Sequence, residues 1–255
     1  MKRLNKQAYN TASRRDFLRR AATTTTGLIF APALLPKSLG ASATVQTPTR
    51  IGIIGSGNIG GSVGLQWAAA GHDVFFSSRH PEELTELVER AGPRAQAGLP
   101  VEAAEFGEVV LIAVPYAANP QVGRDYSPLM QGKVVIDCGN PYPRRDGPMA
   151  TEALAKGSGL ASAEFFPGVR LVRAFNAIGY RSVDSEAHRE GEKVGIPIAG
   201  DDQDAIRTVA ALVVDAGFDP VVVGSLARAR EFDQGSAVYV TDMTAAQLRE
   251  VLGLR

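Results

Sequence analysis

The stretch that decides the fold runs from Ile51 to Gly60 and reads IGIIGSGNIG, and DVFFSSR follows from Asp73 to Arg79. An apolar strand, a glycine-rich turn, a helical segment and a second apolar strand succeed one another in this order. The turn has the spacing G-x-G-x-x-G, which is the fingerprint of a dinucleotide-binding strand–helix–strand unit. We therefore expect this segment to bind the pyrophosphate of a dinucleotide.

Each glycine of the turn is expected to have its own role. Gly55 permits the tight turn, Gly57 lets the backbone approach the pyrophosphate, and Gly60 lets the helix pack closely on the strand. The N-terminus of the following helix offers free N–H groups and a partial positive charge to the phosphates. A glycine-rich turn of another α/β protein would share this spacing, but here the turn lies between a clear strand and a clear helix.

The end of the second strand indicates which nucleotide binds. NAD-binding units usually place an Asp or Glu there, roughly 20 residues past the glycines, to hold the ribose 2′-hydroxyl. This chain has Ser77-Ser78-Arg79-His80 at that place and no acid before Glu82. A guanidinium contact to a 2′-phosphate contributes on the order of 1.5–3 kcal/mol, or about 10- to 100-fold in affinity. We predict NADP(H) rather than NAD(H); the alternative is that Arg79 is simply solvated.

The rest of the chain alternates strands and helices. This alternation predicts an α/β fold: a Rossmann-like, doubly wound, mostly parallel sheet of about eight strands, with a C-terminal strand–helix–strand extension. The further strands are expected at 108–114, 133–138, 170–175, 195–199 and 220–223, and the helices at 61–71, 81–92, 202–217 and 243–252.

Ligands of such sheets bind beyond the carboxyl ends of the strands, so the segments there are candidate site residues. Tyr116 could stack against a flat ring, and Asn140 or Asn176 could bond an amide or carbonyl group. The same residue types are common in ordinary loops. Their position after strands is what makes them candidates for the substrate site.

The N-terminal 43 residues have the features of an export signal. They carry eight basic residues and one acid, and removing them from 27 of each leaves 19 against 26, a net charge of −7. The segment Ser13–Arg19 reads SRRDFLR, a twin-arginine pattern, and Ala41-Ser42-Ala43 supplies a small-residue cleavage site. Its apolar run is too short, and too rich in Pro and Thr, for a stable membrane span.

We therefore expect a signal peptide at 1–43, a linker at 44–49 and one NAD(P)-binding domain at 50–255, in which 192–255 form the extension. The twin-arginine translocase would export this domain folded, to the periplasm or another extracytoplasmic space. Composition indicates no nucleic-acid partner, since basic stripes with interleaved aromatics are absent. A homodimer is compatible with the sequence.

Three other patterns are weighed and set aside. Gly60–Gly64 matches the nucleophile elbow G-x-S-x-G, but Ser62 falls in the expected helix rather than on the turn. The three histidines share no ligand spacing with one another or with a cysteine, so no metal site is expected. Cys138 is the single cysteine, which excludes an intramolecular disulfide, and we expect a buried structural thiol there.

Over nearly all of the part that follows the signal, the chain resembles the NADPH-dependent deazaflavin reductase family, whose members pass hydride between NADP(H) and the deazaflavin coenzyme F420. The same fold occurs in the cytosolic domain of membrane ferric reductases. The matching stretches are 55–60, 71–74 with Ser78-Arg79, 113–115, 174–176, 199–202, 217–220 and 224–230.

The resemblance implies a set of site residues. The pyrophosphate would be held by Ser56, Gly57, Asn58 and Ile59, together with the turn at Gly55, and the 2′-phosphate by Ser78 and Arg79. The nicotinamide ribose and ring would be bordered by Val114, Pro115 and Ala174. Apart from the resemblance, the candidates for the substrate side are Tyr116, Asn140, Asn176 and Arg230. Hydride would pass directly between two stacked rings, so no acid or base is named.

Two departures bear on the second substrate and on cofactor choice. Glu82 and Glu83 stand where family members can carry a second basic residue, and Ala117 and Ala118 lack the polar groups of deazaflavin-binding members. We therefore expect an exported NADP(H)-dependent oxidoreductase whose acceptor is a flat ring, such as a deazaflavin or flavin, or an imine. The alternatives are a non-catalytic NADP(H)-binding module and an imine reductase of the pyrroline-5-carboxylate reductase type, which ends instead in a long helical domain.

Overall fold

The computed structural model describes residues 48–254. The expected N-terminal unit is present as strand β1 (Arg50–Ile54), helix α1 (Asn58–Ala69) and strand β2 (Asp73–Ser77). β1 and β2 pair in parallel, with Ile51 beside Val74 and Ile54 beside Ser77. The glycine turn therefore lies at the carboxyl end of β1, next to the carboxyl end of β2.

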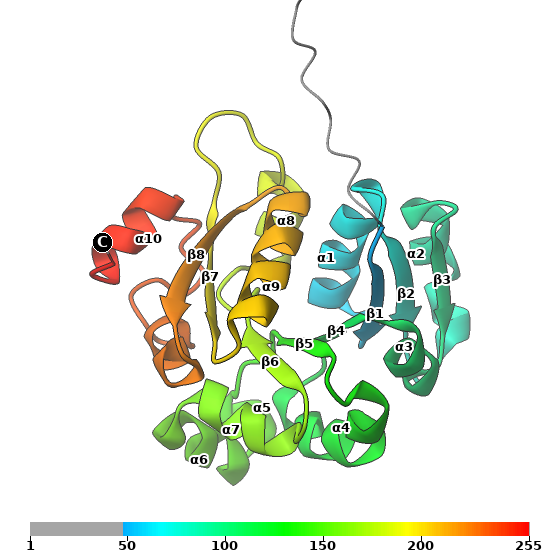
Figure 1. Cartoon of the computed structure of the whole chain (residues 1–255), viewed down its shortest axis with the longest axis horizontal. Helices are drawn as coiled ribbons and strands as arrows, with labels where there is room; N and C mark the ends of the chain where they lie inside the picture. Colours follow the sequence, from blue (N-terminus) through cyan, green and yellow to red (C-terminus); the bar gives the residue numbers. More distant parts are fainter. Residues whose placement is uncertain (1–47, 255) are drawn as a thin grey trace, which may run out of the picture. The chain divides into compact units, whose positions relative to one another are not determined.

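One sheet of eight strands organises the domain, in the order β3-β2-β1-β4-β5-β6-β7-β8 (Figure 1). The α/β fold with a doubly wound, mostly parallel sheet is thus confirmed, including the number of strands. The remaining strands are β3 (Ala95–Gly98), β4 (Val109–Ile112), β5 (Val134–Asp137), β6 (Arg170–Arg173), β7 (Gly195–Gly200) and β8 (Asp219–Gly224).

The C-terminal extension joins this sheet through one antiparallel pairing. β6 and β7 run antiparallel, with Val172 opposite Gly200 and Arg173 opposite Ala199, whereas β7 and β8 are parallel to each other. The helix between β7 and β8 is α9 (Gln203–Asp215), so the expected strand–helix–strand unit is confirmed. Because of the reversal, β7 and β8 end at the edge of the sheet where the other six strands begin.

Helices cover both faces of the sheet, as its buried side chains require. One face packs Ile53, Phe76 and Leu111 against α1, α9 and α8 (Tyr180–Glu186), with Trp67 of α1 in this core. The other face packs Ile54 and its neighbours against α3 (Pro100–Phe106), α4 (Asn119–Tyr126) and the segment that ends in α7 (Ser158–Phe165). Strands buried on both sides explain the near-continuous apolar runs of β4 and β5.

The remaining helical segments connect these elements. They are η1 (Pro81–Leu84), α2 (Thr85–Ala91), η2 (Tyr116–Ala118), η3 (Ser127–Met130), α5 (Pro143–Asp146), α6 (Pro148–Lys156), η4 (Leu226–Phe232) and α10 (Ala245–Val251). α10 packs against β7 and β8 at the far edge of the sheet from β3 (Figure 1). No helix within residues 48–254 combines the length and apolarity that crossing a membrane requires.

The structure differs from the sequence-based expectation in several places. The segment 81–92 was expected to be one helix, but it begins as the 3-10 turn η1. The strand β3, the helices α3 and α8, the helices between 116 and 165 and the 3-10 segment η4 were not predicted. β3 reads AQAG and lacks the β-branched and aromatic residues by which strands are recognised. The expected export signal lies outside the described residues.

Candidate functional site

The glycine turn has the geometry that its sequence predicts. Gly55 has φ +97°, and a Cβ at this residue would lie 2.7 Å from the carbonyl oxygen of Ala113. A Cβ at Gly60 would lie 2.2 Å from the carbonyl oxygen of Gly55 and 3.1 Å from a methyl group of Ile53. Backbone conformation therefore requires glycine at position 55, and the close packing of α1 on β1 requires it at position 60.

Gly57 is glycine for neither of these reasons. Its φ of −74° is accessible to any residue, and a Cβ there would meet no protein atom within 4 Å. The residue is the N-cap of α1, where free N–H groups and the positive end of the helix dipole face outward. Open space at this point is what the close approach of a pyrophosphate to the backbone needs, so the turn fits a dinucleotide.

Two serines fasten the glycine turn to the end of β2. The N–H of Ser56 donates to the carbonyl oxygen of Ser77 at 2.9 Å, and the N–H of Ser77 donates to Ser56 Oγ at 2.8 Å. The buried hydroxyl of Ser77 donates to the carbonyl oxygen of Ile53 at 2.6 Å. These bonds fix the distance between the pyrophosphate turn and the residues that follow β2, which would contact the ribose 2′ position.

A cavity of about 730 Å³ extends from the glycine turn over the end of β2. Arg79 and Ser78 line it, and Arg79 is exposed and in no ion pair with any residue of 48–254. Glu83 lines the same cavity, so one carboxylate is present near the basic residue. The other lining residues include Gly55, Ser56, Gly57, Val114, Pro115 and Tyr126.

A second cavity of about 620 Å³ adjoins the first and shares four of its lining residues, which are Gly57, Ala113, Val114 and Pro115. It lies over the carboxyl ends of β4, β5 and β6. Its further lining is rich in aromatic and amide side chains. The residues of this lining include Asn58, Ile59, Asn140, Tyr142, Arg145, Phe175, Asn176, Tyr180 and Tyr239. The two cavities together offer room for a dinucleotide and for a second ring beside its far end.

The structure brings most of the expected site residues to these cavities. All of the expected cofactor contacts line one or both cavities, except Ala174. Ala174 is fully buried at the end of β6, directly before two residues that do line the second cavity. Asn140 and Asn176 lie there together, and Asn140 Nδ2 donates to the backbone oxygen of Asn176 at 2.7 Å.

Tyr116 does not face a ligand, contrary to the expectation that it stacks on a flat ring. Its side chain is fully buried, and its hydroxyl contacts Ser162 Oγ at 3.0 Å and the carbonyl oxygen of Ser158 at 3.3 Å. Its ring packs edge-to-face on Phe165. Burial, and next the carboxylate of Asp137, raise the pKa of Tyr116 above its usual value. Tyr116 therefore anchors η2 to α7 in the interior.

Arg230 also lies away from both cavities. Its guanidinium donates to the carbonyl oxygen of Lys156 at 2.7 Å and covers the Cα of Gly157. This contact joins η4 to the end of α6, which is a structural role. Cys138, in contrast, behaves as expected: its buried thiol donates to the carbonyl oxygen of Ile112 at 3.3 Å, and burial raises its pKa to about 12.

Two tyrosines and an arginine form a cluster that the sequence did not reveal. The hydroxyls of Tyr142 and Tyr239 are hydrogen-bonded to each other across the second cavity. The guanidinium of Arg145 lies 4.7 Å from the ring centroid of Tyr142. Asp146 holds this guanidinium through two bonds of 2.8 Å. Burial opposes ionisation of Asp146, but the bonds from Arg145 and from the Tyr142 N–H outweigh it and lower the pKa of the carboxyl group.

A buried ionic network supports the floor of this cluster. Arg173, at the end of β6, is fully buried and donates to Asp137 Oδ2 at 2.8 Å and to the carbonyl oxygen of Gly139 at 2.7 Å. Its other terminal nitrogen lies 3.3 Å from Asp233, which also accepts from Ser158 Oγ at 2.5 Å. Burial alone would lower the pKa of Arg173, but the two carboxylates outweigh it and raise the pKa. The network joins β5 and β6 to the segment that carries Tyr239.

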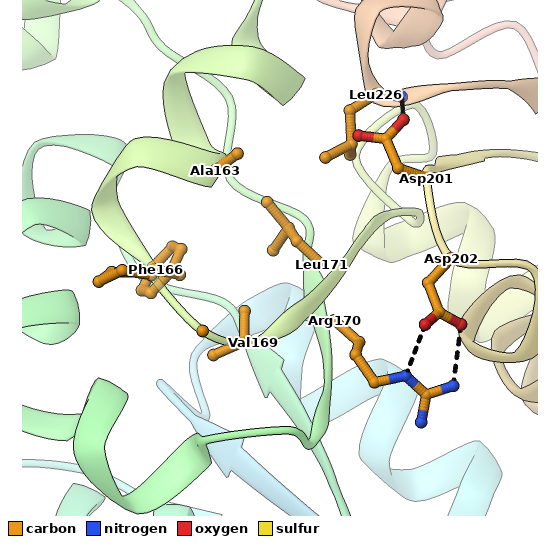
Figure 2. A pocket seen from close by; sticks show the side chains of 10 residues that line it. Ala163, Phe166, Val169, Arg170, Leu171, Asp201, Asp202 and Leu226 are labelled. Atoms are coloured by element: carbon orange, nitrogen blue, oxygen red, sulfur yellow. Dashed lines mark hydrogen bonds and ion pairs between the residues drawn. The ribbon is translucent and has the colours of Figure 1, made fainter.

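A third cavity, of about 440 Å³, lies at the opposite edge of the sheet (Figure 2). Arg170 at the start of β6 pairs there with both oxygens of Asp202, at 2.9 and 3.0 Å, and Asp201 accepts from the N–H of Leu226. The polar side chains of this cavity bond one another, whereas Ala163, Phe166, Val169 and Leu171 supply its apolar wall (Figure 2). The dinucleotide site and this cavity are therefore separate. Residues 48–254 contain no group of three His, Cys, Asp or Glu side chains placed to hold a metal ion.

The fold and the two adjoining cavities define a Rossmann-type dinucleotide-binding protein. Residues 50–141 match the model of the family described as "NADP oxidoreductase coenzyme F420-dependent". The match covers the glycine turn, Arg79, Val114 and Asn140, and it ends before the C-terminal half of the second cavity.

Two curated proteins are similar in sequence. The chain is 30% identical over 186 residues to the metalloreductase STEAP3 of Rattus norvegicus, which covers 72% of this chain and 36% of that protein. It is 30% identical over 136 residues to the F420-dependent NADP reductase of Methanothermobacter marburgensis, which covers 49% of this chain and 61% of the relative. The chain thus spans about a third and about three fifths of these relatives.

Two solved structures share the fold over almost their whole length. A hypothetical protein from Sinorhizobium meliloti superposes with a TM-score of 0.65 and 26% identity, covering 78% of this chain and 97% of that chain. A putative F420 dependent NADP-reductase from Arthrobacter sp. superposes with a TM-score of 0.61 and 20% identity, covering 81% and 96%. At this identity the second likeness concerns the fold alone.

Proposed function

We propose that this protein is an NADP(H)-dependent oxidoreductase that exchanges hydride with a second substrate bound in the cavity of Tyr142 and Tyr239. One observation carries the proposal. The cavity at the glycine turn, which Arg79 lines at its 2′-phosphate end, adjoins a second cavity at Val114 and Pro115. A nucleotide-binding site alone would not need that second cavity. The family match over residues 50–141 supports NADP(H) as the nucleotide.

Different residues of the chain would bind the different parts of the nucleotide. The N–H groups at the start of α1 would hold the pyrophosphate, and Ser78 with Arg79 would hold the 2′-phosphate. Val114 and Pro115 lie where the two cavities meet, so they would border the nicotinamide end. When bound there, the reduced nucleotide supplies a hydride. The aromatic lining of the second cavity excludes water from the neighbouring ring and fixes its plane, which is the main contribution of the protein to such a reaction.

The second substrate that fits best is a flat ring system. Tyr142, Tyr180, Phe175 and Tyr239 supply aromatic surface, and Asn140 supplies an amide. The names of the two relatives, a metalloreductase and an F420-dependent NADP reductase, both describe reductases. We propose a deazaflavin, a flavin or a cyclic imine as the acceptor class.

Direct transfer of a labelled hydride tests this proposal. The full-length protein is incubated with NADPH deuterated at the reactive carbon and with a flavin, a deazaflavin, a cyclic imine or a ferric chelate, and each product is examined by mass spectrometry. Deuterium on a carbon of the reduced deazaflavin or of the reduced imine would support the proposal, as would stoichiometric reduction of the flavin, whose nitrogen-bound deuterium exchanges with water. Tight NADPH binding without oxidation by any acceptor would contradict it and would favour a non-catalytic binding module.

We also propose that the protein is exported folded by the twin-arginine translocase, with NADP(H) already bound. The expected signal at 1–43 supports this proposal, as does the buried, unpaired Cys138. A nanomolar complex that forms at about 10⁶ M⁻¹s⁻¹ would lose its nucleotide within roughly 10³ s, so long-lived retention requires tighter binding.

Replacing Arg14 and Arg15 together by lysine should keep the protein in the cytoplasm, as judged by cell fractionation. The exported protein, denatured directly after isolation, should release NADP(H), which an enzymatic cycling assay would detect. Export that persists in the double variant would contradict the route. An exported protein that releases no nucleotide would contradict retention.

A further inference from the structure

The second cavity contains a hydroxyl pair that the residues around it hold in place from two sides. Tyr142 follows β5 and is the N-cap of α5, and Tyr239 follows η4, 97 residues later in the chain. Both line the cavity together with Val114 and Pro115, which border the nicotinamide end. The pair therefore lies in the compartment where a second substrate would meet the nucleotide.

Tyr142 is fixed through the short helix that it begins. Its N–H donates to Asp146 Oδ2 at 2.8 Å, and the same carboxylate holds Arg145. The guanidinium of Arg145 is thereby kept over the ring of Tyr142. The cation cannot turn away without breaking its bonds to Asp146 and to the carbonyl oxygen of Asn140.

Tyr239 is fixed by a strained neighbour. Val240 has φ +54°, a left-handed conformation that is a genuine outlier for a β-branched residue. Its N–H donates to the carbonyl oxygen of Ala177 at 2.8 Å, and its side chain faces Gly179. Such strain persists only where the surroundings over-determine the backbone, and it concentrates at functional sites. The strain here holds the hydroxyl of Tyr239 against that of Tyr142.

The pair leaves one donor free. Each phenol has a single O–H donor and either hydroxyl can donate to the other, so the pair uses only one of its two donors internally. The other O–H can donate to a ligand in the cavity. Tyr142 is the better proton donor of the two, because the cation of Arg145 lies over its ring, whereas burial and the hydrogen bond to Tyr142 raise the pKa of Tyr239.

We propose that Tyr142 is the general acid of the reaction, and that Tyr239 and Arg145 position it and stabilise its anion. This inference rests on the proposed function. The reduced nicotinamide gives a hydride to the carbon of a C=N or C=O group, or of a conjugated ring, and is oxidised. The π electron pair moves to the heteroatom, which takes the proton of the Tyr142 hydroxyl. The acceptor thus gains one hydride and one proton.

The tyrosinate that remains is stabilised by two neighbours. Tyr239 donates a hydrogen bond to its oxygen, and the guanidinium of Arg145 lies over its ring. A proton from solvent then restores Tyr142, because the side chain is only half-buried at the mouth of the cavity. Asp146 balances the charge of Arg145 when Tyr142 is neutral, so the resting cluster carries no net charge.

The test compares two acceptors with the same ring skeleton, only one of which needs a proton. The cyclic imine 3,4-dihydroisoquinoline needs a hydride and a proton, whereas its N-methyl iminium salt needs only a hydride. At alkaline pH, where the imine is not protonated, Tyr142→Phe should lower kcat with the imine by about 100- to 10,000-fold, which is the usual contribution of a general acid. With the iminium salt kcat should stay within about two-fold.

Variants at the other tyrosines separate the roles. Tyr239→Phe should lower kcat with the imine by about ten-fold and leave the iminium reaction unchanged, because it removes one hydrogen bond to the developing tyrosinate. Tyr116→Phe removes a tyrosine hydroxyl outside both cavities. The ratio of its kcat values with the imine and the iminium salt should equal that of the wild-type protein. An equal loss with imine and iminium salt in Tyr142→Phe, or no loss with either, would overturn the proposal.

An equilibrium measurement tests Tyr142 without turnover. Isoquinoline N-oxide carries an oxygen that accepts a hydrogen bond, whereas the N-methylisoquinolinium cation has no acceptor at that position. Tyr142→Phe should weaken binding of the N-oxide about ten-fold, measured by fluorescence titration, and leave the cation unchanged. Unchanged N-oxide binding would contradict a free donor at Tyr142. If the wild-type protein binds the N-oxide but reduces neither acceptor, the proposed function fails while the assignment of the donor stands.

Discussion

The two ends of the proposed nucleotide site, the 2′-phosphate end at Arg79 and the hydride end in the second cavity, are built in different ways. The 2′-phosphate end uses one short stretch of chain, from the glycine turn to Arg79, and its key side chain is exposed. The hydride end draws on segments near Val114, Tyr142, Phe175 and Tyr239, which are far apart in sequence. The first end is set by local backbone geometry, whereas the second depends on a buried ionic network and a strained turn.

This difference decides where mutations should act. A change at the 2′ end should alter affinity and leave folding intact, because that end carries little of the core. A change beneath the hydride end should alter folding first, because the network of Arg173 lies between β5, β6 and the segment of Tyr239. The predictions below use matched pairs of residues to separate these two behaviours.

The largest expected effect comes from Arg173→Met. Removing the guanidinium leaves Asp137 and Asp233 buried without a counter-charge, which typically costs about 3–5 kcal/mol of the free energy of unfolding. Arg170→Met removes an arginine–aspartate pair from the same strand, but this pair is partly exposed and should contribute little to the free energy of unfolding. Chemical denaturation of the two variants measures both values. Equal losses would show that the network does not carry the stability assigned to it.

The second prediction sets Gly57 against Gly60. Gly57→Ser retains a good N-cap for α1, so its free energy of unfolding should change by less than about 0.5 kcal/mol. Its side chain would fill the space open to the pyrophosphate, and NADPH affinity should fall by about 10- to 100-fold. Gly60→Ser should instead destabilise folding, because its Cβ would lie 2.2 Å from the oxygen of Gly55. A Gly57→Ser variant that binds NADPH normally would refute the assigned pyrophosphate position.

The smallest effect is expected at the opposite edge of the sheet, where Asp202 caps α9 and pairs with Arg170. The hydrogen bond from Arg170, and next that from the N–H of Ala205, lower the pKa of Asp202 to about 2. A carboxyl group with a lowered folded-state pKa stabilises the fold above its unfolded pKa and loses this contribution as the pH falls through the folded value.

Asp202→Asn keeps the cap and removes the charge. Its melting temperature should therefore be slightly lower than that of the wild-type protein at neutral pH, and the two should converge as the pH falls from about 4 to 2. Nucleotide affinity should not change. A difference that is constant over this pH range would show that the charge of Asp202 is not the cause.

Local sequence was sufficient to predict the geometry of the glycine turn and its position beside the end of β2. The glycine spacing, the alternation of apolar runs and the residues after β2 lie within 30 positions of one another, and backbone sterics and strand order determine their arrangement. The strand–helix–strand extension was predictable for the same reason, since Gly195–Gly200 and α9 are long and periodic. The reversal of β7 against β6 was not, because sequence patterns do not give strand direction.

The hydride end was only partly predictable. The position of Tyr116 after β4 indicated a site residue, but the 3-10 turn η2 directs its side chain into the core, and no local pattern showed this. Tyr142 lies two residues after Asn140, which was expected at the site, but its partner Tyr239 comes from a region with no strand or helix pattern. Long-range contacts between such segments depend on the tertiary structure. A pair of tyrosines is also too common a feature to be recognised from sequence.

The most direct test of the account is the affinity of the full-length protein for NADPH and NADH, measured by fluorescence titration in wild-type protein, Arg79→Ala and Arg249→Ala. Arg249 lies on α10, and its replacement by alanine removes the same charge far from the proposed nucleotide site. The wild-type protein should prefer NADPH, and Arg79→Ala should lose about 10- to 100-fold of that preference while Arg249→Ala keeps it. A ratio of affinities that Arg79→Ala leaves unchanged would contradict the assignment of the 2′-phosphate site.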